Sequence, residues 1–289
     1  MVKNLLFNMD TEARKQGVEL SMLAKLLFDK GVALWAWVLW IEVAAGLLAA
    51  VSGLINLSDQ WSIILAIIGF LLLASAYYFK IRFENIYDNA ETMRRQSVLT
   101  DALGWPIGKT QFSEWRLLAG KKVIARLETT EEDPDYFATK VDIGAKRFLE
   151  MTQESAFWTR HLYCYLRKIA WIFFVVAVIF FFLVLTTAAT DVVSRGVALK
   201  VVYAVYLLLP LVLVVDVLGW AIRLGRLINS IGQIEKDMEK LSNENPLDEK
   251  KVLRLVFEYN CQVVSGIPIP GWVFKRQHDY IADLWKKNQ

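Results

Sequence analysis

The sequence predicts a mainly α-helical integral membrane protein, with four transmembrane helices in two hairpins and a largely helical cytosolic domain. Three observations support this. The 289-residue chain is 55% hydrophobic, which is more than most soluble domains. It contains four apolar runs, each long enough to cross about 30 Å of hydrocarbon, which takes about 20 residues. Charged residues still make up 22% of the chain, so a large part must lie in water.

The first 30 residues predict a cytosolic amphipathic helix. Val18, Met22, Leu26 and Leu27 recur at helical spacing and lead toward the first apolar run. No signal peptide is evident, so internal helices are expected to direct insertion into the membrane.

The four apolar runs are the expected membrane spans. One of them could be the buried helix of a soluble domain, but four together would be very unusual. They cover approximately residues 31–55, 61–79, 169–189 and 201–222, which gives transmembrane hairpins over residues 31–79 and 169–222.

Lysine and arginine positions predict the orientation. Five precede the first span, fifteen lie between the second and third, and eleven follow the fourth. None lies in the loop of the first hairpin, and only Arg195 and Lys200 flank the loop of the second. By the positive-inside rule, the N-terminus, the middle segment and the C-terminus are all cytosolic.

The cytosolic middle segment covers residues 80–168. Residues 80–100 are expected to extend the second span as a charged helix, with its arginines and lysines facing solvent or headgroups. Residues 101–150 carry several turn signals, and the stretch "KVIARLE" fits either a short strand or a helix. Residues 146–168 predict a helix that runs into the third span.

Residues 223–289 predict a helical cytosolic tail. Asn245 is suited to cap its second helix and Pro246 to begin it. That helix is expected to end near Gly266, and "PIPGW" is expected to form a rigid turn before the last helix. The first helix of the tail carries an apolar stripe suited to face a partner, made of Leu227, Ile231, Ile234, Met238 and Leu241.

The sequence shows no catalytic centre, cofactor motif or metal site. Phosphate-binding loops and the common hydrolase and metalloprotease motifs are absent. His161 and Cys164 could share a helix face, but two ligands do not make a zinc site, and packing is the expected role. Cys164 and Cys261 both lie in segments expected in the cytosol, so no disulfide is predicted. An enzyme is therefore not expected, and the net charge of +3 is too small to indicate nucleic acid.

Glu42 is the deepest charged residue of the predicted spans. It lies about eleven residues into the first span, near mid-depth, where a charge costs roughly 2.5–3.5 kcal/mol. It should therefore face protein or water, with two roles open: a pore or gating residue, or a hydrogen bond between helices. Small residues that permit close helix approach follow it at spacings of three and four, namely Ala45, Gly46, Ala49, Ala50 and Gly53.

Asp216 is the charged residue of the fourth apolar run. Because this span exits into the cytosol, Asp216 lies about six residues, or roughly 9 Å, from its inner end. Arg223, two turns later on the same face, could draw it toward the interface. Asp216 is thus a candidate for the cytosolic mouth of a pore, or for a link to the soluble domain.

Two stretches carry a resemblance to a known family. "QESAFWTRHLY" precedes the third span, and "PIPGWVFKRQHDY" follows a proline turn in the tail. With the order of two spans, a cytosolic middle, two spans and a helical tail, the chain resembles the four-transmembrane pore-forming effectors of bacterial nucleotide-signalled, CBASS-like anti-phage defence systems.

The resemblance implies a multi-pass protein of the bacterial inner membrane that depolarises it during infection. It implies a homo-oligomer, with a tetramer as the first expectation, and a nucleotide or short oligonucleotide signal made by a partner nucleotidyltransferase. The phosphates of such a signal need cationic or N–H donors. The candidates are Lys121, Lys122 and Arg126, with Lys146, Arg147 and Arg160 as a second group.

Two other functions remain open from the sequence. The first is a non-conducting membrane scaffold that recruits a soluble partner through its cytosolic helices. The second is a membrane enzyme with an unfamiliar site, for which loss of activity in His161→Ala would be the simplest support.

Overall fold

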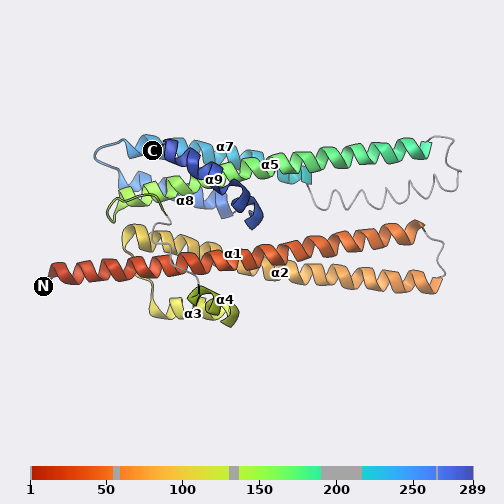
Figure 1. The fold of residues 1–289 in the computed structure, drawn as a ribbon, viewed down its shortest axis with the longest axis horizontal. Coiled ribbons are helices and arrows are strands. Elements are labelled where there is room, and N and C mark those ends of the chain that lie inside the picture. Colours follow the sequence, from red (N-terminus) through yellow and green to blue (C-terminus); the bar gives the residue numbers. More distant parts are fainter. Residues whose placement is uncertain (1, 55–58, 130–136, 190–216, 265, 289) are drawn as a thin grey trace. The chain divides into compact units, whose positions relative to one another are not determined.

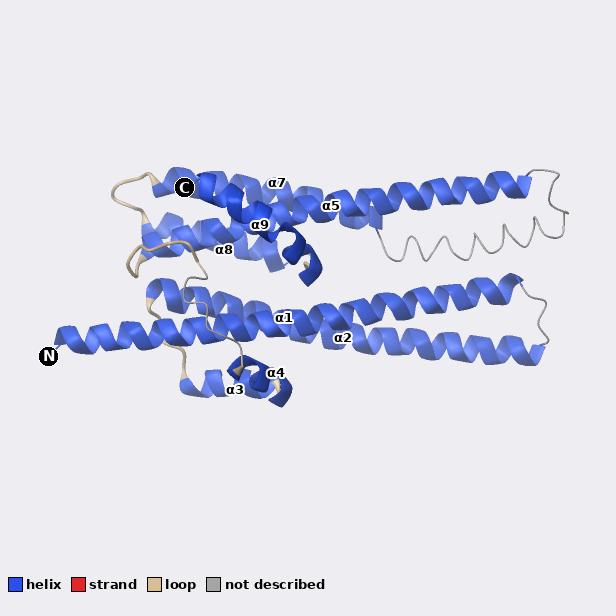
Figure 2. Cartoon of the chain, viewed as in Figure 1, coloured by secondary structure: helices blue, strands red, loops and turns tan. Residues whose placement is uncertain are grey.

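The computed structural model describes residues 2–54, 59–129, 137–189, 217–264 and 266–288. Helices, loops and turns account for all of these residues, with no strand among them (Figure 2). This confirms the predicted helical fold class for the described part of the chain. That part contains eight helices: α1 (Val2–Leu54), α2 (Asp59–Leu103), α3 (Lys109–Ala119), α4 (Lys121–Glu128), α5 (Ala145–Ala189), α7 (Val217–Ser242), α8 (Glu249–Val264) and α9 (Gly271–Asn288) (Figure 1).

Three helices are long and apolar enough to cross a membrane. The candidate spans lie within Lys15–Leu48 of α1, Gln60–Leu103 of α2 and Ala145–Ile179 of α5. Few side chains of their apolar windows are buried within the chain, as expected of segments that face lipid. The fourth predicted span, residues 201–222, lies for the most part outside the described residues, and Asp216 lies outside them altogether.

Each candidate span is one part of a longer continuous helix. The amphipathic N-terminal segment and the first span form α1, and the charged extension predicted for residues 80–100 continues the second span within α2. The helix predicted over residues 146–168 likewise runs into the third span within α5. No proline occurs before Pro106 or within α5, so nothing in these helices removes a backbone donor and interrupts them.

The chain divides into two compact units. Unit 1 consists of Met1–Val32, Glu84–Cys164 and Arg226–Gln289, and unit 2 consists of Ala33–Phe83 and Tyr165–Gly225. The apolar segments thus gather in unit 2, and the segments expected in the cytosol gather in unit 1.

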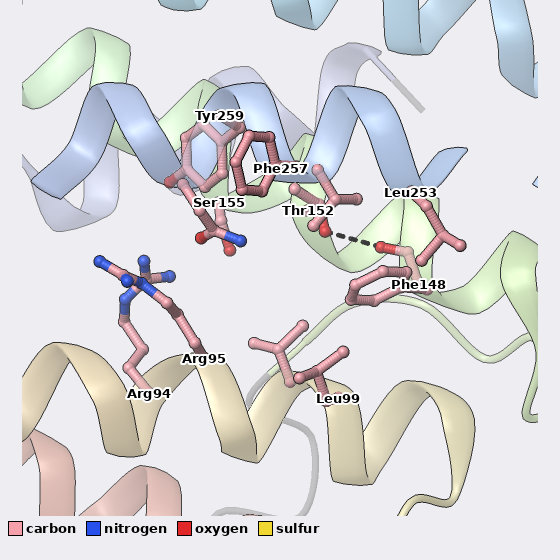
Figure 3. A pocket seen from close by; sticks show the side chains of 12 residues that line it. Arg94, Arg95, Leu99, Phe148, Thr152, Ser155, Leu253, Phe257 and Tyr259 are labelled. Carbon is pink, nitrogen blue, oxygen red and sulfur yellow. Dashed lines mark hydrogen bonds between the residues drawn. The ribbon is translucent and has the colours of Figure 1, made fainter. Parts of the chain in front are cut away.

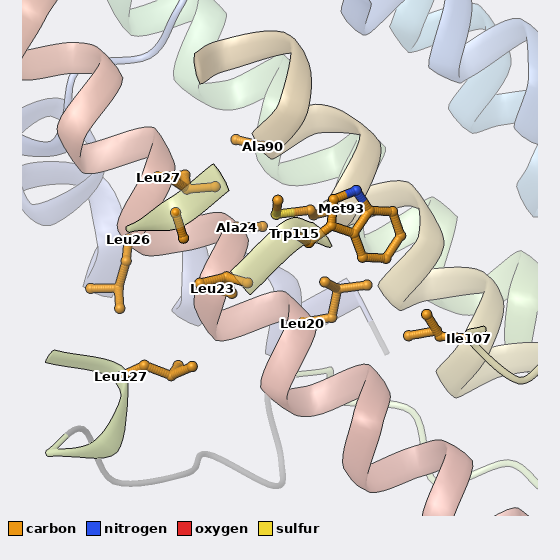
Figure 4. Close-up of a cluster of buried hydrophobic side chains, with 11 residues drawn as sticks. Leu20, Leu23, Ala24, Leu26, Leu27, Ala90, Met93, Ile107, Trp115 and Leu127 are labelled. Carbon is orange, nitrogen blue, oxygen red and sulfur yellow. The ribbon is translucent and has the colours of Figure 1, made fainter. Parts of the chain in front are cut away.

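A hydrophobic cluster in unit 1 joins the first four helices (Figure 4). Fully burying one leucine stabilises a fold by about 1.5–3 kcal/mol, so a cluster of this size fixes how these helices pack. It consists of Leu20, Leu23, Ala24, Leu26 and Leu27 of α1, Ala90 and Met93 of α2, Ile107, Trp115 and Ala119 in or just before α3, and Leu127 of α4.

The stretch "KVIARLE", which fitted a strand or a helix, is helix α4. Leu127 is buried in the cluster, and Val123 and Ile124, one turn earlier, pack against it. Helical spacing therefore brings the apolar side chains of this stretch to one face. Gly120 separates α3 from α4 with φ of 82°, a backbone conformation that favours glycine.

The tail follows the predicted order of helices, with one correction. All five residues of the predicted apolar stripe of α7 are buried. Asn245 and Pro246 do not begin α8, which starts at Glu249. Asp248 caps it instead, because its carboxylate accepts hydrogen bonds from the N–H groups of Lys250 (3.0 Å) and Lys251 (3.4 Å).

Candidate functional site

Glu42 lies on the side of α1 that packs against other residues of unit 2. Val38 and Ala45, one turn before and after it, are buried. Glu42 itself is half-buried, and the positive charge of Lys80 acts on its carboxylate. Both roles considered for Glu42 require an acid that faces protein. The second predicted acid, Asp216, is outside the described residues.

The first predicted basic group lies on the surface of α4. Lys121, Lys122 and Arg126 are all exposed. Lys122 and Arg126 are one helical turn apart and share a face, while Lys121 begins the helix. None of the three lines the pocket described below, so this group is an open surface.

The second predicted basic group does not form a common anion site. Lys146 is exposed, Arg147 is buried, and Arg160 is held in an ion pair with Glu235. In that pair, Nε and Nη2 of Arg160 lie 2.8 and 3.2 Å from the two carboxylate oxygens. Burial raises the pKa of Glu235, and the Arg160 guanidinium opposes that rise.

Arg147, a predicted ligand-binding residue, is buried and bonded to other parts of the protein. Its Nη2 donates to both carboxylate oxygens of Asp101 at 3.2 Å, and its Nε donates to the Asp101 carbonyl at 3.3 Å. Its Nη1 donates to the carbonyls of Val141 (2.9 Å) and Thr139 (3.4 Å). The guanidinium therefore joins the last turn of α2 to the loop before α5, and its donors are used by protein acceptors.

Unit 1 contains a pocket of about 280 Å³, which we call the arginine pocket (Figure 3). This volume is close to the lower end of the range for small-molecule sites, about 300–1,000 Å³. In Figure 3, Arg94 and Arg95 extend from α2 at one end, whereas Leu99, Phe148 and Leu253 lie toward the other. The lining is completed by Val98 of α2, Thr152 and Ser155 of α5, and Val256, Phe257, Tyr259 and Asn260 of α8.

The cationic end of the arginine pocket lies beside the Glu91 carboxylate. One oxygen of the buried Glu91 carboxylate lies 3.1 Å from Nη2 of Arg94 and 3.6 Å from Nη2 of Arg95. One carboxylate thus faces two guanidinium groups. In addition, the buried Nε of Arg95 has no hydrogen-bond partner among the described residues. An anionic group of a ligand would supply an acceptor for this N–H.

Three tyrosines lie in this part of unit 1, and one of them, Tyr259, lines the pocket. Burial raises the pKa of Tyr87 and of Tyr163 well above the ordinary value, and the nearby Glu91 charge adds to both shifts. Tyr259, which lines the pocket, shares a hydrogen bond of 3.0 Å with the Thr159 hydroxyl. These hydroxyls can donate hydrogen bonds, but burial disfavours their ionised form.

The two stretches that carry the family resemblance pack against each other in unit 1. The Trp158 ring of the first stretch lies 5.6 Å from the Phe274 ring and 5.5 Å from the His278 ring of the second. One residue earlier on α5, Phe157 lies 5.0 Å from Trp285 of α9. The aromatic residues that stand out in the sequence therefore hold α9 on α5.

His161 packs in this region against Phe157. Its Nδ1 lies 2.8 Å from the Phe157 carbonyl, and its ring centroid lies 4.2 Å from that of Phe157. Burial lowers the pKa of His161, which favours the neutral ring. Among the described residues, no group of three or more potential ligands could hold a metal ion, and Cys164 and Cys261 are unpaired.

Sequence reasoning missed Arg94 and Arg95. They were expected on a solvated or headgroup-facing surface, but both are partly buried and line the pocket. A usable signal was the adjacent face of α2, where Ala90, Met93 and Ser97 recur at spacings of three and four. Such a face indicates packing against protein, so arginines beside it lie at the edge of an interface.

Comparisons with family models, with curated proteins and with solved structures find no match to this chain. The function proposed next therefore rests on the residues of the chain itself and on the resemblance of its two aromatic stretches.

Proposed function

We propose that this protein is a membrane effector of bacterial anti-phage defence. It forms a homo-oligomeric ion channel or pore that depolarises the inner membrane, and a nucleotide or short oligonucleotide made by a partner nucleotidyltransferase controls it. The arginine pocket carries this proposal. Two of the three helices that line it, α2 and α5, contain candidate membrane spans as well.

This arrangement offers a direct route from ligand to membrane. Arg94 lies about fifteen residues after the predicted end of the second span at Phe79, or roughly 22 Å along α2. A ligand that binds one arrangement of α2 and α5 more tightly than another shifts the protein toward that arrangement. Both helices continue into apolar segments, so they connect the pocket to the candidate spans along the chain.

The chemistry of the pocket suits a nucleotide. Arginine guanidinium groups bind phosphate oxygens in a bidentate manner, and Arg94 and Arg95 place two such groups at one end of the pocket. Phe148, Phe257 and Tyr259 provide ring faces for a base, and the Asn260 side chain can donate to and accept from its edge. The mostly apolar wall would be poorly suited to inorganic phosphate alone.

The conducting path is proposed at the interface of several copies, with four as the first expectation. A single chain with four spans leaves little room for water between them. Glu42, which faces protein in unit 2, is the candidate for the path itself, and Asp216 is the candidate for its cytosolic mouth.

Ion flux from liposomes that contain the purified protein tests the proposal. We expect flux to change when candidate cyclic or linear oligonucleotides are added. We expect Glu42→Gln to alter conduction in the liganded protein. Arg95→Gln should weaken the ligand response about tenfold to a hundredfold, since a hydrogen bond to a charged group contributes about 1.5–3 kcal/mol.

Arg254→Gln is the matched control, because Arg254 is an exposed arginine on α8 that pairs with Glu258 at 2.8 Å. It should leave the ligand response unchanged. Correctly inserted wild-type protein that gives no flux with or without any of the oligonucleotides would refute the channel.

A scaffold is the second candidate, favoured by one feature of α8. Leu253, Phe257 and Val264 are exposed at spacings of four and seven, which places them on one face of the helix. A soluble partner could cover this stripe. The scaffold predicts a co-purifying partner that is lost in Phe257→Ser, and no effect of Glu42→Gln on growth arrest.

A further inference from the structure

We propose that the corner between α3 and α4 is an interfacial anchor that docks on anionic lipid headgroups. The α3–α4 corner consists of Leu117 and Leu118 at the end of α3, and Lys121 and Lys122 at the start of α4. Leu117 is 80% exposed and Leu118 is 57% exposed. Two exposed leucines beside two exposed lysines form the pattern of a surface that inserts shallowly at a lipid interface.

The exposure is imposed by the way the two helices pack. Trp115 and Ala119 of α3 and Leu127 of α4 are buried in the cluster of unit 1 (Figure 4). With these residues fixed inward, Leu117 and Leu118 must face outward. Gly120, with its positive φ, forms the turn between the helices, so the two lysines begin α4 three residues after Leu118.

The corner is held next to the segment of α1 that leads into the first span. Its buried side contacts the cluster that includes Leu20 and Leu27. Leu27 is four residues, or about 6 Å along the helix, before the predicted start of the span at Gly31. An α-helix with its side chains is about 10 Å wide, and the headgroup layer adds about 5–8 Å to each side of the hydrocarbon. Because α3 and α4 pack on α1 so close to the predicted start of the span, they lie within reach of the headgroups.

The exposed cations together with the exposed leucines favour lipid headgroups over a free nucleotide as the occupant. Lys109, Lys121, Lys122 and Arg126 of the two helices are exposed, and the acidic residues among the described positions 109–128 are Glu114 and Glu128. Headgroups and acyl chains together engage both the lysines and the leucines. A soluble nucleotide at the lysines would leave Leu117 and Leu118 in water. The proposal does not depend on the channel function.

A lipid-quenching experiment on the full chain in nanodiscs tests the anchor. A fluorophore is attached at Leu117→Cys in a Cys164→Ser/Cys261→Ser background, and lipids carrying a quencher near the headgroup are included. We expect strong quenching in phosphatidylcholine mixed equally with phosphatidylglycerol, and weaker quenching in phosphatidylcholine alone. Fluorescence that is equally unquenched in both bilayers would overturn the proposal. Leu117 is exposed, so this substitution leaves the core intact.

Lysine variants distinguish a lipid headgroup from a nucleotide as the anion that binds the corner. Lys121→Gln/Lys122→Gln should remove most of the preference for phosphatidylglycerol, at about fivefold per lysine. Lys250→Gln/Lys251→Gln, an adjacent exposed lysine pair on α8, should preserve it. If the lysine variants instead lose binding of a fluorescent oligonucleotide, with quenching unchanged, the corner is a nucleotide surface and the lipid proposal is wrong.

Discussion

At the scale of single residues, two neighbouring cations on α5 have opposite environments. Lys146 is exposed, whereas Arg147 is buried against Asp101 and three backbone carbonyls. In the sequence they are equivalent, since both begin a charged helix. Only the neighbours supplied by α2 distinguish them, because residue 101 is distant from them in the chain.

Arg147→Ala should destabilise the protein by about 3–5 kcal/mol, because it removes one member of a buried ion pair with Asp101. Lys146→Ala is the matched control and should change stability by less than about 0.5 kcal/mol. Thermal unfolding of the detergent-solubilised full chain measures both. Equal stability of the two variants would contradict the structural role of Arg147.

Glu154 on α5 makes the stability of unit 1 depend on pH. Burial raises the pKa of Glu154 above its ordinary value of 4.5, and a hydrogen bond of 3.0 Å from the Ala138 N–H opposes the rise. The folded protein then binds this proton more tightly than the unfolded chain does. Its contribution to stability therefore falls as pH rises from 4.5 through the raised folded pKa.

Glu154→Gln should remove this dependence while keeping an oxygen that can accept from Ala138. We expect the difference in melting temperature between the variant and the wild type to shift in favour of the variant as pH rises through that window. Above the window the difference should stay constant. A difference that does not vary between acid and neutral pH would show that Glu154 is not the group responsible.

At the scale of elements, the contact between α5 and α9 connects two distant parts of the sequence. Both helices were predicted from the sequence, but their pairing depends on ring contacts such as those of Trp158 with Phe274 and of Phe157 with Trp285. Aromatic pairs prefer offset or edge-to-face geometry and add to the stabilisation from burial alone. These ring contacts thus give a structural role to the aromatic residues of the two stretches that carry the family resemblance.

Trp285→Ala should loosen α9, at a cost of about 2 kcal/mol, below the ~3–5 kcal/mol typical of a fully buried aromatic residue. Hydrogen exchange of residues 271–288 in the full chain should accelerate. Trp272→Ala, at an exposed position of the same helix, should leave the exchange unchanged.

A conservative variant refines this test. Trp285→Phe should be tolerated, because the ring contact remains and the buried indole N–H has no acceptor among the described residues. Unchanged protection of α9 in Trp285→Ala would mean that other contacts dock this helix.

At the scale of the whole molecule, the predicted topology places the N-terminus, the middle segment and the tail on the cytosolic side. Cys261 on α8 is exposed and provides a natural probe. In a Cys164→Ser background, a membrane-impermeant maleimide should label Cys261 in inverted vesicles and spare it in intact spheroplasts.

The reverse probe is Ser58→Cys, in the predicted loop of the first hairpin, introduced into a chain that lacks the two native cysteines. It should react in spheroplasts and be protected in inverted vesicles. Labelling of Cys261 from outside would overturn the topology and, with it, a signal that acts from the cytosol.

The sequence by itself determined which segments are apolar and most of the helices, but not α3 or α4. Apolar length marks the candidate spans within α1, α2 and α5, and helical periodicity marks the buried stripe of α7. These properties are local, since each depends on residues within a few turns of one another. The same local reasoning failed at Asn245 and Pro246, where another residue with a suitable carboxylate caps α8.

Only the tertiary structure decided which charged residues face one another. It showed that Arg147 pairs with Asp101 and Arg160 with Glu235. It also showed that Arg94 and Arg95 line a pocket together with residues of α8. Electrostatic roles depend on burial and on partners that are distant in sequence, so no periodicity within one helix can reveal them. For this reason the candidate spans could be predicted from the sequence, whereas the arginine pocket could be identified only from the packing of α2, α5 and α8.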